Sequence, residues 1–245
     1  MRTWPEWFVT MEEIVMPRRL IVLSFVVALV ASFGTSPARL TTLAQAGTPP
    51  GSPTAGTETL TDDEIQEIID AAVAAAEQTP SLVRVDGQGA PRTTRMHIAI
   101  VDRNGHLLTL HSMEDAWAVS IDIALAKAYT AAAASSNENA FSSRSIGLLT
   151  QPGGALWNVG NSNDPGTGDD TIEERGLIEF PGGLALYKNG VLVGGIGVSG
   201  DGVDQDELVA EAGAAGYEPA PVIRVDCVLG LAGAYSTNAA PCAGA

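Results

Sequence analysis

The stretch from Gly182 to Glu211, GGLALYKNGVLVGGIGVSGDGVDQDELVAE, constrains the fold of this chain more than any other segment. Its Asn189-Gly190 pair separates two apolar runs, and both residues tolerate the positive φ angles of a tight hairpin turn. We therefore expect two antiparallel strands here. The second strand is unusually rich in glycine, which weakens a strand unless another backbone or a ligand must approach closely. These glycines are Gly194, Gly195, Gly197 and Gly200.

A second hairpin is predicted upstream, from Met96 to Val101 and from His106 to His111 around the turn Asp102 to Gly105. Both strands carry apolar residues on both faces, so we expect the sheet to be covered on both sides. With a two-residue loop, five side chains from the two strands would share one face of the sheet. These are Ile98 and Ile100 with Leu107, Thr109 and His111.

Helical segments surround these hairpins. Thr61 to Glu64 has the pattern of a capping box and begins an amphipathic helix, which Thr79-Pro80 ends. Ser120 to Ser136 is rich in alanine, so another element can approach this helix closely and we expect it to be buried. A short helix is predicted within Phe141 to Leu149 and a last one from Asp204 to Ala215. This order predicts an α+β fold and not a doubly wound parallel sheet.

The N-terminal region is predicted to be an export signal. Arg18 and Arg19 precede the apolar run Leu20 to Phe33, and Ala44-Gln45-Ala46 resembles a cleavage site. We therefore assign residues 1–46 to a signal peptide, with Met16 as an alternative start, and expect a secreted or extracytoplasmic protein. The apolar run is shorter than the roughly 20 residues of a membrane-spanning helix. An uncleaved N-terminal anchor is the alternative; after cleavage no stable membrane span is expected.

Composition divides the rest of the chain and limits its partners. Residues 47–59 have the Pro, Gly, Ser and Thr content of a flexible linker, and residues 60–219 are long enough for one domain with a sizeable core. The formal net charge of the chain is −16. Such an acidic protein repels phosphate backbones and anionic lipid, so nucleic acid is excluded as a partner.

Both cysteines, Cys227 and Cys242, lie in the tail formed by residues 220–245. In an exported protein two cysteines most often form a disulfide, which here would hold the tail. Free thiols or an intermolecular link are the alternatives. The sequence has no Cys and His spacing typical of a zinc site and no Gly-x-Ser-x-Gly nucleophile motif.

Three blocks of sequence together resemble the GlcG/HbpS-type family of haem-binding proteins, which includes the C-terminal domain of PduO-type proteins. They are IAIVDRNGHLL from Ile98, SIDIALAKAYTAAA from Ser120, and the Gly182 stretch extended to Gly213. The resemblance implies a profilin-like unit, an antiparallel sheet of about five strands flanked by helices, and assembly into homo-oligomers. It also implies an association with haem, with corrinoid-related metabolism or with the catabolism of small organic acids.

This chain departs from the family pattern at one candidate iron site. Some haem-sensing members carry two acidic residues, three positions apart, just before the Lys-Ala-x-Thr-Ala block. Here Asp122 occupies the first position and Leu125 the second, which argues against an iron site of that kind. The long loop from Gln151 to Asp170 and the cysteine tail also lie outside the shared pattern.

The candidate haem ligands lie on the first hairpin and on the alanine-rich helix. The three histidines, His97, His106 and His111, are all close to this hairpin, but His97 and His106 should project from one face and His111 from the other. Histidines without a ligand role are the default interpretation. As axial ligand we place His111 first and His97 second, with Lys127 and Tyr129 as further candidates. An apolar wall is expected from Trp117, Phe141 and Trp157.

Three other motifs have simpler explanations. Gly195 to Gly200 matches G-x-G-x-x-G, but it lies in a hairpin and precedes an acidic helix start, so close backbone packing explains it better than dinucleotide binding. Asn161 to Asp169 resembles the beginning of a calcium loop, yet lacks the glutamate at position twelve. Glu173-Glu174-Arg175 is most simply a solvated turn.

The sequence therefore predicts a secreted carrier or sensor of haem or another tetrapyrrole, without an assigned catalytic centre or metal site. One alternative is an enzyme or accessory factor acting on small organic acids through Lys127, Glu174 and Arg175. A purely structural oligomer is the other.

Overall fold

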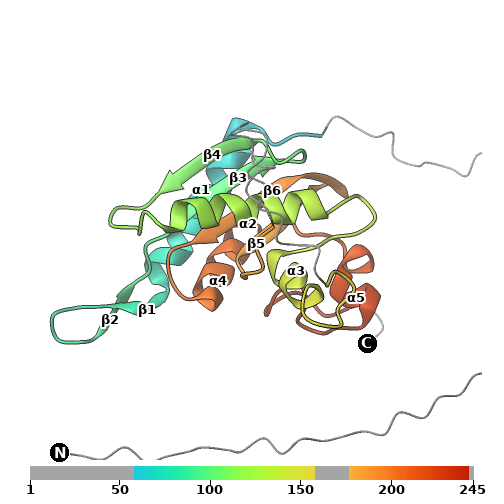
Figure 1. Cartoon of the computed structure of the whole chain (residues 1–245). Helices are drawn as coiled ribbons and strands as arrows, with labels where there is room; N and C mark the ends of the chain where they lie inside the picture. Colours follow the sequence, from blue (N-terminus) through green and yellow to red (C-terminus); the bar gives the residue numbers. More distant parts are fainter. Residues whose placement is uncertain (1–57, 158–176, 243–245) are drawn as a thin grey trace, which may run out of the picture. The chain divides into compact units, whose positions relative to one another are not determined.

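The computed structural model describes residues 58–157 and 177–242 (Figure 1). The helices within them are α1 (Asp62–Gln78), α2 (Ser120–Ala134), α3 (Ser143–Leu149), α4 (Val203–Gly213), the 3-10 helix η2 (Pro221–Ile223) and α5 (Val225–Leu229). The strands are β1 (Pro80–Val85), β2 (Pro91–Thr93), β3 (His97–Asp102), β4 (Leu107–Ser112), β5 (Gly183–Lys188) and β6 (Val191–Ser199).

Four of these strands form an antiparallel sheet in the order β4-β3-β6-β5, which confirms the predicted α+β class. Both expected hairpins are present, and their inner strands β3 and β6 pair with each other. This sheet of four strands agrees with the predicted antiparallel sheet of about five. The remaining strands, β1 and β2, pair only with each other and form a ribbon that projects from the rest of the fold (Figure 1).

Local sequence signals set the ends of α1 as expected. The Thr61 hydroxyl accepts from the Glu64 backbone N–H, and the Glu64 carboxylate accepts from the Thr61 N–H at 2.8 Å. The helix ends at Gln78, directly before Thr79 and Pro80. The capping box therefore satisfies two backbone donors that a helix start otherwise leaves unpaired.

The turn between β3 and β4 is longer than the predicted two-residue loop. Gly105 has a φ of +84° and donates to the Asp102 carbonyl, and Asp102 donates to His106, which gives a three-residue loop. Ile98 lies opposite His111 and Ile100 opposite Thr109, as predicted, but a register shift then pairs Leu107 with Val101. The prediction for Leu107 was wrong because a bulge follows this type of loop.

Helix α2 covers one face of the sheet at very short range (Figure 1). A Cβ atom built on Gly195 would lie 2.5 Å from the Ala128 carbonyl oxygen, and one on Gly197 only 2.1 Å from that of Ala124. The glycines of β6 thus allow helix and strand backbones to touch. The packing interpretation of the G-x-G-x-x-G motif is confirmed.

The opposite face of the sheet packs against α1 and α4. Ile98, Ile100 and Ile196 from the strands contact an apolar cluster that includes Ile68 and Val209. Coverage is incomplete at the edge strand β4, where Leu107 and Leu108 remain nearly half exposed. The prediction of a sheet covered on both sides therefore holds for β3, β5 and β6 but not for β4.

Two short helices follow α4, although the sequence predicted α4 to be the last helix. The segment Pro221–Leu229 forms η2 and α5, and a disulfide joins Cys227 to Cys242, the pairing that we expected. Short helices of this length have too few residues for a clear periodic pattern. The calcium-like motif from Asn161 and the group Glu173-Glu174-Arg175 lie outside the described residues. Within the described residues, no helix has both the length and the apolar character needed to cross a membrane.

The contact between α2 and β6 gives a direct stability prediction. In Gly197→Ala the new methyl group would overlap the backbone of α2, so we expect the free energy of unfolding to fall by about 3 kcal/mol. Urea denaturation followed by circular dichroism measures this change. Gly87→Ala is the matched control, since no atom lies within 4 Å of its Cβ position. Equal stability of the two variants would contradict the proposed role of Gly197.

Candidate functional site

His97 is buried on β3 and both of its ring nitrogens have partners. Nε2 lies 2.9 Å from the Trp117 carbonyl oxygen and Nδ1 lies 2.8 Å from the Ser112 hydroxyl. Because a carbonyl only accepts, Nε2 carries the proton and Nδ1 accepts from Ser112. No ring lone pair is left for a metal ion. The structure thus gives His97 the role of joining β3 to the loop before α2.

His111 has a different environment. It lies on the edge strand β4 opposite Ile98, its side chain is partly exposed, and within the described residues its imidazole has no hydrogen-bond partner. His97 and Ile98 are neighbours in β3, so His111 and His97 project from opposite faces of the sheet, as predicted. A partly exposed imidazole without a partner is able to ligate an iron ion.

His106 lies on neither strand. It precedes β4 in the turn, its side chain is 77% exposed, and its Nδ1 is 3.2 Å from an Asp102 carboxylate oxygen. The backbone N–H groups of His106 and Asn104 also donate to the Asp102 carboxylate. Partial burial alone would raise the pKa of Asp102, but these hydrogen bonds lower it below its usual value. His106 therefore belongs to a turn that Asp102 organises.

Lys127 is completely buried on the sheet side of α2. Its ammonium group donates to the Val198 carbonyl at 2.9 Å and to the Asp206 carboxylate at 2.7 Å. Burial lowers the pKa of Lys127 and raises the pKa of Asp206. The charge of Asp206 opposes the shift at Lys127, and the charge of Lys127 opposes the shift at Asp206. Asp206 also accepts from the N–H groups of Gly200 and Asp201. This ion pair joins α2 to the start of α4, so Lys127 is not available as an iron ligand.

Tyr129 and the expected aromatic residues Trp117 and Phe141 lie at different places in and around α2. The Tyr129 ring packs on the β3–β4 turn, where a Cβ on Gly105 would lie 2.5 Å away from it. Trp117 precedes α2 and lies against the Arg84 guanidinium, whereas Phe141 follows that helix. A helix of this length spans about 22 Å. Trp117 and Phe141 are thus at opposite ends of α2 and do not line a common wall.

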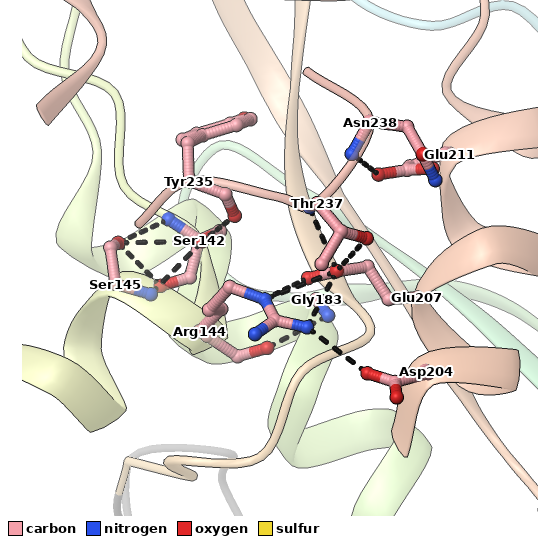
Figure 2. Close-up of polar contacts among 11 residues, drawn as sticks. Ser142, Arg144, Ser145, Gly183, Asp204, Glu207, Glu211, Tyr235, Thr237 and Asn238 are labelled. Atoms are coloured by element: carbon pink, nitrogen blue, oxygen red, sulfur yellow. Dashed lines mark hydrogen bonds and ion pairs between the residues drawn. The ribbon is translucent and has the colours of Figure 1, made fainter. Parts of the chain in front are cut away.

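A second buried ion pair was missed by the sequence analysis. The Arg144 guanidinium from α3 donates to Glu207 of α4 at 2.8 Å through both Nε and Nη2 (Figure 2). The Glu207 carboxylate raises the pKa of Arg144. Thr237 of the tail donates to the same carboxylate through its backbone N–H and its hydroxyl. The sequence analysis treated Glu207 as part of an acidic helix start, although it is completely buried.

The position of the family's acidic pair lies on α2. Asp122 is exposed on α2 beside an open cavity of about 380 Å³, which Ile123, Ala126 and Ile178 also line. Leu125 is buried and carries no ligand atom. A single exposed carboxylate offers too few ligands to hold an iron ion tightly.

Comparison with known proteins decides the family. The family model described as "Haem degrading protein HbpS-like" matches residues 60–215, which is more than half of the chain. This chain belongs to the HbpS-like family. The predicted family resemblance is confirmed.

Relatives of the HbpS-like chain occur among curated proteins. An uncharacterized 15.0 kDa protein from the dhaT-dhaS intergenic region of Citrobacter freundii is 34% identical over 113 residues, which cover 46% of this chain and 69% of that protein. The corrinoid adenosyltransferase PduO of the same organism is 35% identical over 114 residues, again 46% of this chain. The matched part spans only 30% of PduO.

Solved structures of similar proteins include a PduOC:heme complex and HbpS. The PduOC complex is 28% identical with a TM-score of 0.49, and the match covers 64% of this chain and 94% of that chain. HbpS is 25% identical with a TM-score of 0.43, covering 69% of this chain and 96% of that chain.

The buried pair of Lys127 and Asp206 leads to a prediction on stability and pH. Lys127→Met leaves the Asp206 carboxylate buried without its cation, so we expect a loss of about 3–5 kcal/mol in the free energy of unfolding near neutral pH. Burial raises the pKa of Asp206, so the folded variant takes up a proton more readily than the unfolded chain. The loss should therefore shrink as the pH falls toward 5.

Urea denaturation at several pH values tests this prediction. Asp206→Asn, added to Lys127→Met, removes the unpaired charge and keeps an acceptor for Gly200 and Asp201, so it should recover part of the loss. The control is Lys188→Met, which breaks a partly exposed pair with Glu64 and should change stability much less than Lys127→Met. A loss in Lys127→Met that does not depend on pH would contradict the assignment.

Proposed function

We propose that this protein binds haem or a related tetrapyrrole as an extracytoplasmic carrier or sensor, with His111 as the axial ligand. The observation that carries this proposal is membership of a family described by its haem chemistry, in a chain whose His111 imidazole has no partner within the described residues. A PduOC protein of similar sequence is known in complex with haem, which supports the same ligand class.

The surroundings of His111 suit one face of a haem. A neutral imidazole is a common axial ligand of haem iron, and an exposed ring on an edge strand leaves the approach to iron open. Leu107 and Leu108 on β4 are 46% and 42% exposed and offer apolar surface nearby in sequence. The other three candidates are less suitable because His97 and Lys127 have their polar atoms bonded and Tyr129 packs on the turn.

Export is proposed on two grounds. Residues 1–46, outside the described part of the chain, have the pattern of a signal peptide. The disulfide between Cys227 and Cys242 supports an oxidising compartment, since such bonds are rare where thiols are kept reduced. The rival function, action on small organic acids, has less support because Lys127 is fully engaged with Asp206.

Titration of the purified protein with haemin tests the function. The wild-type protein should show a saturable shift of the Soret band, with one haem bound per chain or one per contact between two chains. His111→Ala should weaken haemin binding at least tenfold. His106→Ala is the matched control, because His106 is exposed on the neighbouring turn and pairs only with Asp102. Absence of any spectral change at micromolar haemin would refute the proposal, and equal binding by both variants would remove His111 from it.

We also propose that copies of this chain assemble through the β1–β2 ribbon. Leu82, Val83 and Val85 on β1 are 67%, 48% and 58% exposed, which is unusual for a strand of a monomer. The ribbon is held firmly at its base, since Asp201 accepts from the Leu82 N–H at 2.8 Å and Arg84 stacks on Trp117. A rigid apolar ribbon that projects from the fold is suited to pack on another protein surface.

Charge supports a second copy of the same chain as the partner. Residues 80–95, which include the ribbon, carry Arg84, Arg92 and Arg95 and one acid, Asp86, in a chain whose formal net charge is −16. Asp201 adds a second acid at the base of the ribbon. The outer face of α1 is strongly acidic, with the exposed residues Asp62, Asp63, Glu67, Asp70 and Glu77. The basic ribbon of one copy therefore complements α1 of another.

Light scattering coupled to size exclusion measures this assembly. Val83→Asp combined with Val85→Asp should convert the wild-type oligomer to a monomer while its circular dichroism spectrum stays unchanged. Val222→Asp combined with Val228→Asp, at exposed positions near the C-terminus, serves as the control and should leave the oligomer intact. A wild-type protein that is monomeric at tens of micromolar would refute this part of the proposal.

A further inference from the structure

A cavity of about 740 Å³ lies between α4 and the C-terminal segment. It is bordered by Leu184 of β5, Leu208 of α4, Pro221 of η2 and Tyr235 of the tail. Strand β5 forms one edge of the sheet and β4, which carries His111, forms the other. The cavity is therefore separate from the haem ligand proposed above, and its tail wall lies beyond residues 60–215 that match the family.

The tail wall of this cavity is fixed by specific bonds (Figure 2). The Ser142 hydroxyl donates to the Tyr235 carbonyl, and Thr237 donates twice to Glu207. Asn238 donates to the Glu211 carboxylate through its backbone N–H at 3.2 Å and its amide at 2.8 Å. The Cys227–Cys242 disulfide closes the segment that contains these residues. The cavity thus has rigid walls, as preformed ligand sites do.

One buried polar group of a lining residue lacks a partner. The Tyr235 hydroxyl is buried beside the Ala185 backbone and has no partner of hydrogen-bond geometry within the described residues. Buried polar groups without partners are rare in native proteins. An unpaired group in a residue that lines a cavity of this size supports the interpretation of the cavity as a ligand site.

The charges around the cavity favour a cation. Two acidic residues border it, Glu211, which is partly exposed, and Glu218, which is exposed. The one basic residue of the lining, Arg224, is bound by both carboxylate oxygens of Asp226 at 3.0 Å and lies on the Tyr235 ring. Its charge is thereby neutralised. Haem, with its two propionates, would be repelled here.

We propose that this cavity binds an apolar organic cation, such as an amine attached to two or three fused rings or to an equivalent alkyl body. The apolar body would contact Leu184, Leu208 and Pro221, and the cationic group would lie near Glu211 and Glu218. The volume is within the roughly 300–1,000 Å³ of small-molecule sites. The inference does not depend on haem binding.

Two fluorescent probes that differ in charge test this proposal on the full mature chain. Dansylcadaverine carries an ammonium group, and N-dansyl-6-aminohexanoate carries a carboxylate on a similar chain with the same fluorophore. We expect saturable fluorescence enhancement with the cation and at least tenfold weaker binding of the anion. Equal or stronger binding of the anion would overturn the proposal, as would no binding of the cation up to millimolar concentration.

Variants place the probe in the cavity. Glu211→Gln with Glu218→Gln should weaken cation binding about tenfold, and Ala240→Trp should block it, because Ala240 is exposed and lines the cavity. Glu114→Gln with Glu138→Gln removes the same charge at exposed positions outside the cavity lining and should leave binding unchanged. Melting temperatures show whether each variant is folded. A cation affinity that is the same in all four proteins would refute this location.

Competition separates this site from the haem site. Saturating haemin should not displace dansylcadaverine if the two sites are distinct. Displacement of dansylcadaverine, together with a loss of haemin binding in Ala240→Trp, would mean that haem occupies the cavity, which would overturn the inference. If haemin fails to bind but dansylcadaverine binds as predicted, the proposed haem function fails and the cavity assignment remains.

Discussion

The close approach of α2 to β6 is the constraint on which the rest of this structure depends. Gly195 and Gly197 let the helix backbone rest on the strand backbone, and no other residue would leave room for it. This short separation brings the Lys127 ammonium to the end of β6, where it donates hydrogen bonds to the Asp206 carboxylate and the Val198 carbonyl. The position of α4 against the sheet is therefore linked to the glycines of β6 through a buried ion pair.

Signals that act between near neighbours could be predicted from the sequence. The capping box at Thr61, the Asn189-Gly190 turn and the glycine spacing of β6 each have a local physical cause, and all three have the structure that the sequence indicated. The order of the predicted helices and hairpins indicated the α+β class, and the order of the three sequence blocks indicated the family. The bulge after the Asp102 turn escaped prediction because Gly105 adopts positive φ and adds one residue to the loop.

The candidate site could be predicted only in part, because its environment is set by residues far apart in the sequence. Spacing identified His111 and Lys127 as candidate ligands. It could not show that Asp206 pairs with the lysine, or that His111 has no partner among the residues that the structure describes. Acidic residues at a helix start are usually solvated, so Asp206 and Glu207 looked like surface charges. Their partners Lys127 and Arg144 come from α2 and α3, and no short-range pattern reveals such pairs.

The bonds from Thr237 to Glu207 change where this domain ends. A completely buried carboxylate in α4 takes two of its hydrogen bonds from a residue beyond the last position that the family model matches. The backbone of β5 also donates to Tyr217, and Ala140 pairs with Arg224. The unit that unfolds cooperatively therefore extends to the second cysteine. A chain shortened to the family boundary would expose Glu207 to water and lose part of its core, although every family motif remained.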